Sequence, residues 1–161
     1  MRRRSILCGI VLTAGLVPAA PAHAATAGTK ATYCSVSVYS VYAGDVAERD
    51  GRDEIRIKAG GNLYPGDGFY KKFRTGDTFY GSAFDNAATT VDEDSDARFS
   101  LREVKPPAAG GGTNLGSFRV KWKDCKNLQV GAYAYSTTKQ VSGKHQTKYD
   151  YRVVLKITGK G

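Results

Sequence analysis

Alternation of apolar and polar residues recurs along most of this chain, and helical spacing is nearly absent. Successive side chains of a β-strand point to opposite faces, so this alternation predicts strands that bury one face. Eight segments show it: residues 33–42, 54–59, 69–74, 79–84, 98–102, 118–123, 129–136 and 148–157. Turns rich in glycine separate them. Short strands at this spacing are typical of β-sandwiches and β-barrels, and one wet face per strand favours antiparallel pairing.

The N-terminus has the order of a signal peptide. Arg2–Arg4 are followed by an apolar run over residues 5–17 and by the small-residue site Ala22-His23-Ala24. This order predicts a signal peptide over residues 1–24 and a secreted, extracellular domain over residues 25–161. The apolar run is too short for a membrane anchor, and no stretch of the mature chain is long enough to span a bilayer. The arginines fit the general and the twin-arginine export routes alike.

Two cysteines, Cys34 and Cys125, remain after removal of the signal peptide. The compartment outside the membrane is oxidising, so an even pair predicts one disulfide bond, Cys34–Cys125. Two free thiols, or bonds to other chains, are the alternatives.

The charge of the chain is unevenly distributed. The net charge of +9 falls to +6 when Arg2–Arg4 leave with the signal peptide. Residues 45–54 and 92–98 are acidic, whereas residues 119–161 carry ten Lys or Arg against Asp124 and Asp150. A basic surface favours anionic partners such as acidic polysaccharides, phospholipid headgroups or nucleic acids. Solubility alone is the simpler interpretation.

Motifs of catalysis are missing. The mature chain has one histidine, His145, in a predicted turn, and no nucleophile motif accompanies it. An exposed turn histidine is therefore the expectation. No zinc-binding pattern and no phosphate-binding glycine loop occur. A hydrolase that uses two carboxylates stays open, because acids are plentiful but no pair is singled out.

Two acidic runs are candidate calcium sites, because calcium takes several hard oxygen ligands held close together. Asp92, Asp94 and Asp96 have the spacing of a helix-loop-helix calcium loop, but Ala97 stands where that loop needs glycine. The remaining interpretation is an acidic loop that binds calcium or is simply solvated. The second run, with Asp45, Asp50 and Asp53 as candidate ligands, leaves the same two interpretations open.

Aromatic residues are frequent, with ten tyrosines and one tryptophan in the chain. Aromatic side chains are favoured in strands, so packing is the first explanation of this number. Trp122 falls on the inward face of its predicted strand. Tyr133 and Tyr135 lie opposite the alanine face of theirs and are the better candidates for exposed rings, as in a sugar-binding platform.

Three segments resemble a known family. Residues 36–45, then 50–58, and the later Leu115-Gly116-Ser117-Phe118 resemble the strands and the acidic loop of synaptotagmin-type calcium/phospholipid-binding β-sandwich domains. The resemblance covers roughly residues 34–158.

The resemblance implies a single antiparallel eight-stranded β-sandwich with its loops at one end. It matches Asp45 or Asp50, together with Asp53, to the first calcium loop of that family. The family's second acidic loop falls at residues 106–113, which contain no acid.

These observations favour a secreted, non-catalytic binding domain. Its expected ligand is an envelope polysaccharide, an anionic surface or an extracellular protein, with calcium as the candidate cofactor. A secreted protease inhibitor or toxin-like effector is the first alternative, with residues 106–113 or 141–147 as the presented loop. A carboxylate-based hydrolase is the second.

Overall fold

The computed structural model describes residues 28–107 and 110–161, so the predicted signal peptide lies outside the described residues. The strands are β1 (Tyr33–Asp45), β2 (Asp53–Ala59), β3 (Asn62–Tyr64), β4 (Lys71–Phe73), β5 (Thr78–Tyr80), β6 (Ala88–Val91), β7 (Ala97–Glu103), β8 (Thr113–Val120), β9 (Tyr133–Tyr135), β10 (Lys139–Lys144) and β11 (Lys148–Lys160). Two short 3-10 helices, η1 (Gly81–Phe84) and η2 (Trp122–Asp124), interrupt them. In the described part of the chain, no helix is long and apolar enough to cross a membrane.

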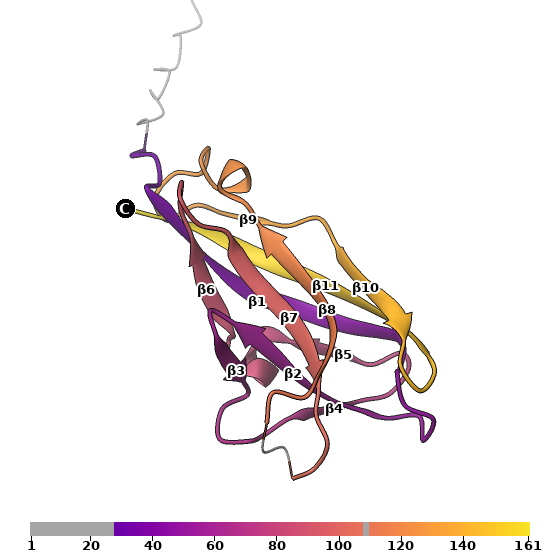
Figure 1. Cartoon of the computed structure of the whole chain (residues 1–161). Helices are drawn as coiled ribbons and strands as arrows, with labels where there is room; N and C mark the ends of the chain where they lie inside the picture. The colour runs from indigo at the N-terminus through magenta and orange to yellow at the C-terminus, as the bar shows by residue number, and fades with distance from the viewer. Residues whose placement is uncertain (1–27, 108–109) are drawn as a thin grey trace, which may run out of the picture.

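The strands form two antiparallel sheets (Figure 1). The six-stranded sheet has the order β10-β11-β1-β5, with β6 also paired to β1 and β9 to β11. The five-stranded sheet has the order β3-β2-β7-β8, with β4 also paired to β2. The predicted all-β sandwich is confirmed.

One hydrophobic core lies between the sheets. It draws alternate residues from both, among them Val36, Ile57, Leu101, Val153 and Leu155. The inward phase predicted from alternation is therefore correct for β2, β7 and β11, since Ile55, Ile57, Phe99, Leu101 and the alternate residues of β11 are buried.

The predicted disulfide bond is present. Cys34 lies in β1 and Cys125 directly follows η2, and both are fully buried. The bond joins positions 91 residues apart, and so ties the segment after β8 to the start of β1.

A β-bulge in β1 matters for function. Val38 lies opposite Leu155, and Ser40 lies opposite Val154, so Tyr39 is an extra residue with no partner on β11. A bulge of this kind redirects a side chain and changes the phase of the strand. Val38 and Val41 are buried on either side of it, and Tyr39 points to solvent.

Some segments differ from the sequence prediction. Residues 79–84 were predicted as one strand, but only β5 is extended and the rest is η1. Residues 118–123 end in η2, so Trp122 is half-buried at the core margin and not in a strand. Strands β3, β6 and β10 lie outside the eight predicted segments.

Candidate functional site

The first acidic run does not present its carboxylates together. Asp45 and Asp50 are exposed, whereas Asp53 is fully buried at the start of β2. The Asp53 carboxylate accepts hydrogen bonds from the backbone N–H of Ala47 at 2.6 Å and of Glu48 at 2.9 Å. It also accepts one from the hydroxyl of Tyr151. Asp53 therefore holds the β1–β2 loop in place.

The second run forms the turn between β6 and β7. The Asp92 carboxylate accepts hydrogen bonds from the backbone N–H of Asp94 and the hydroxyl of Ser95, and the Ser95 bond lowers the pKa of Asp92 below its usual value. Asp96 pairs with the guanidinium of Arg119 at 3.0 Å. These acids stabilise a turn and a cross-strand ion pair.

No group of three His, Cys, Asp or Glu side chains among the described residues is arranged to hold a metal ion. The six aspartates named from the sequence are thus in the positions just described, and calcium binding by them stays a prediction.

A buried polar cluster lies where three loops meet, at the end of the sandwich that holds the start of β2 and the end of β7. The Glu103 side chain is 1% exposed, and its Oε2 lies 3.2 Å from Nδ1 of His145. Burial, with the carboxylates of Glu48 and Asp53, raises the pKa of Glu103 to about 7. His145 is half-buried against this carboxylate, so the sequence expectation of an exposed turn histidine is wrong.

The turn between β10 and β11 closes this cluster. The backbone N–H groups of Gln146 and Thr147 both donate to the carbonyl of Ala47, at 3.1 and 2.8 Å. The Gln146 amide also donates to the carboxylate of Glu48 at 3.0 Å. These bonds hold the turn on the β1–β2 loop (Figure 1) and leave Glu103 with no route to a substrate.

The outer face of the six-stranded sheet carries a row of exposed tyrosines, here called the tyrosine ridge: Tyr80, Tyr39, Tyr135 and Tyr133, with 58, 41, 49 and 57% of each residue exposed. Neighbouring ring centroids lie 5.9 Å apart from Tyr80 to Tyr39, 4.7 Å from Tyr39 to Tyr135 and 5.7 Å from Tyr135 to Tyr133. The Lys156 ammonium lies 4.4 Å from the centroid of the Tyr133 ring. The row is therefore continuous and ends beside a cation.

Three local features build the ridge. The β1 bulge turns Tyr39 outward, and Tyr80 lies opposite its neighbour Ser40. In β9, Tyr133 and Tyr135 flank Ala134, which lies opposite Ile157 and faces inward. The ridge thus crosses β5, β1, β11 and β9.

The sequence identified half of the ridge. The exposure of Tyr133 and Tyr135 is confirmed, because alternation with alanine was visible in the sequence. Tyr39 and Tyr80 were missed. The order of the strands brings them to Tyr135, and the bulge that exposes Tyr39 leaves no mark in the alternation.

Comparisons with known proteins give little beyond the architecture. No protein-family model matches the sequence, and no match is found among curated proteins. Among solved structures the chain is similar to a domain of plant extended synaptotagmin 1, the first of its C2 type, with a TM-score of 0.48 and 12% identity over 81% of this chain and 95% of that one. This is a weak likeness to the family whose resemblance was noted in the sequence.

Proposed function

We propose that the chain is a secreted, non-catalytic binding module whose tyrosine ridge binds an extracellular polysaccharide. The observation that supports this proposal is the continuous row of four exposed tyrosines.

Exposed aromatic rings gathered in one row suggest a contact surface. Single apolar side chains on a surface are ordinary, but a contiguous group of them is characteristic of binding. Tyrosine offers a large, amphipathic contact area and loses little conformational entropy when it is fixed. Because the ridge is built on paired strands and its rings touch one another, much of that entropy is already lost before a ligand arrives.

The chemistry of the ridge suits a sugar chain. A pyranose ring has an apolar face of C–H groups and a rim of hydroxyls, and a tyrosine has an apolar ring and a polar tip. Desolvation, with the neighbouring hydroxyls of Tyr39 and Tyr133, raises the pKa of Tyr135 above 10, so this hydroxyl stays protonated and able to donate. A row across four strands favours an extended ligand with a repeating unit.

The closed loop cluster supports the non-catalytic part of the proposal. A hydrolase needs its acid and base within reach of the substrate. Glu103 and its neighbour His145 form the one close carboxylate–histidine contact among the described residues, and the carboxylate is inside the protein. Calcium is not required by the ridge. Comparing the melting temperature in calcium and in chelator tests that cofactor separately, since a ligand of the folded state raises it.

The experiment is retention of the purified protein on suspensions of insoluble peptidoglycan, chitin and cellulose. We expect the wild-type protein to be retained by one of them, and Y39A and Y135A each to weaken retention by about tenfold, as truncation of a central interface tyrosine does. Substitution of exposed side chains should leave the free energy of unfolding within about 0.5 kcal/mol.

Tyr33→Ala is the matched control, because Tyr33 is also an exposed tyrosine of β1 but makes no ring contact with the ridge. Equal loss in Y33A would mean general stickiness. Absence of retention, together with a dimer in light scattering that Y39A dissociates, would replace the polysaccharide by a second copy of the chain.

A further inference from the structure

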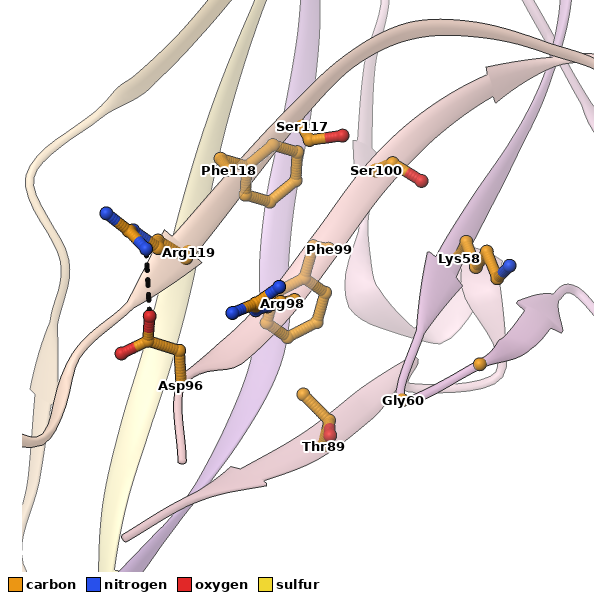
Figure 2. A pocket seen from close by; sticks show the side chains of 11 residues that line it. Lys58, Gly60, Thr89, Asp96, Arg98, Phe99, Ser100, Ser117, Phe118 and Arg119 are labelled. Atoms are coloured by element: carbon orange, nitrogen blue, oxygen red, sulfur yellow. Dashed lines mark hydrogen bonds and ion pairs between the residues drawn. The ribbon is translucent and has the colours of Figure 1, made fainter. Parts of the chain in front are cut away.

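A second surface hollow lies on the five-stranded sheet, away from the tyrosine ridge. It is an open pocket of about 680 Å³ over the ends of β2, β7 and β8 nearest the β2–β3 turn. Figure 2 shows that its charged side chains come from all three of these strands and from the turn before β7. The cations are Lys58, Arg98 and Arg119, and the one acid is Asp96.

The register of the sheet brings the polar groups together. Lys58 of β2 lies opposite Ser100 of β7, which lies opposite Ser117 of β8. One step along the same face, Arg98 lies opposite Arg119. Two hydroxyls thus lie beside three cations within neighbouring rows of one sheet face.

Two of these cations differ from the other basic residues on this face. Arg56 donates to the carbonyls of Pro65 and Leu63, and Arg102 donates to those of Gly111 and Gly112. Those arginines hold loops. Across the described residues, by contrast, neither Lys58 nor Arg98 has a hydrogen bond or an ion pair from its side chain, and both are exposed.

The pair Arg98 and Arg119 is unfavourable by itself. Like charges directly opposite on an antiparallel pair repel each other and destabilise it. Asp96 compensates Arg119 alone, at 3.0 Å. The pocket therefore keeps an excess of positive charge that an anion between the two arginines and Lys58 would neutralise.

From this we infer that the pocket binds a tetrahedral oxyanion, a phosphate or sulfate group carried by an extracellular glycan or polyol chain. Guanidinium groups form paired, charge-assisted hydrogen bonds with such groups, an ammonium adds a point charge, and serine hydroxyls donate to the remaining oxygens. The site lies on a different sheet from the tyrosine ridge and does not depend on it.

The experiment is a titration of the purified protein with inorganic phosphate and with sulfate at low ionic strength, followed by the amide signals of the protein in NMR. We expect shifts at Gly60, Ser100 and Ser117, reversed by added salt. The double variant K58Q/R98Q should bind at least about tenfold more weakly, because it removes two charge-assisted contacts. A glycerol phosphate oligomer and a sulfated oligosaccharide, titrated in the same way, distinguish the two carriers.

Two further variants make the test specific. Lys126→Gln is the charge-matched control, because Lys126 is exposed and does not line the pocket. Asp96→Asn should tighten binding several-fold, since it releases Arg119 from its ion pair.

Unchanged affinity in K58Q/R98Q, or a per-charge loss in K126Q as large as in that variant, would overturn the inference. Unchanged affinity in D96N would contradict the part assigned to Arg119. Melting temperatures of all variants verify folding. Retention on polysaccharide should persist in K58Q/R98Q and phosphate binding in Y39A, so the two sites can fail separately.

Discussion

Glu103 is a buried carboxylate in a strand whose inward positions are otherwise apolar. Its two oxygens and Nδ1 of His145 have no hydrogen-bond partner within the described structure, although the two side chains are 3.2 Å apart. Glu48, Asp53, Lys105 and Tyr151 are the other ionisable groups whose charges act on it or on which it acts. An ionised carboxylate in such a place costs free energy, and a protonated one costs less.

The pKa of Glu103 makes the stability of the protein depend on pH. Its folded pKa is about 7, above the usual 4.5, so the folded state keeps a proton that the unfolded state has lost. The stabilisation is complete below about pH 4.5 and is lost as the pH rises through about 7, on the order of 1–3 kcal/mol. Glu103→Gln should flatten this part of the profile, as measured by urea unfolding from pH 4.5 to 8.

Glu93→Gln is the control, because Glu93 is exposed in the β6–β7 turn. Its profile should follow that of the wild type. If E103Q lost stability between pH 5 and 7 as steeply as the wild type, another group would have to carry the dependence.

At the scale of elements, the β1–β2 loop depends on one carboxylate. Asp53 accepts from two loop N–H groups and from the Tyr151 hydroxyl, all in a buried setting. In Asp53→Asn one acceptor oxygen becomes an NH₂ donor facing another donor. We expect the free energy of unfolding to fall by about 2–4 kcal/mol in chemical denaturation, because buried donors are left without partners.

Asp50→Asn offers the comparison within the same loop. Asp50 is exposed and accepts only from the backbone N–H of Arg52, at 3.0 Å. Its substitution should change stability by about 0.5 kcal/mol or less. Equal effects of the two substitutions would contradict the role given to Asp53.

The strands with clean alternation could be predicted from the sequence, and the others could not. Residues 54–59 and 98–102 match β2 and β7 closely, because one face of each is apolar. Strands β3 and β6 are three and four residues long, too short for a period to show. Strand β10 has one buried residue, Val141, so its pairing with β11 rather than its own pattern makes it a strand.

The two candidate binding surfaces could be predicted only in part, for a related reason. Alternation indicates which face a side chain takes, but not which strand lies beside it. Tyr135 could be placed on an outer face, yet its contact with Tyr39 follows from strand order. Likewise, the charge of Arg98 was visible in the sequence, but its position opposite Arg119 follows from register.

At the scale of the whole molecule, the disulfide bond is the longest covalent constraint. It joins Cys34 to Cys125 across 91 residues of sequence. In the chain-entropy account, such a loop contributes about 4–5 kcal/mol by restricting the unfolded chain. The double variant C34A/C125A should lose about this amount in urea unfolding. The same stability with and without the bond would show that the chain entropy is offset elsewhere.

The tyrosine ridge and the pocket occupy the outer faces of different sheets, with the whole core between them. No residue belongs to both, and substitutions at distant, independent sites add. The bulge residue Tyr39, moreover, has no partner on β11 and takes no place in the core. Each surface can therefore diverge through successive substitutions while the other is conserved, so related sequences could share one specificity and differ in the second.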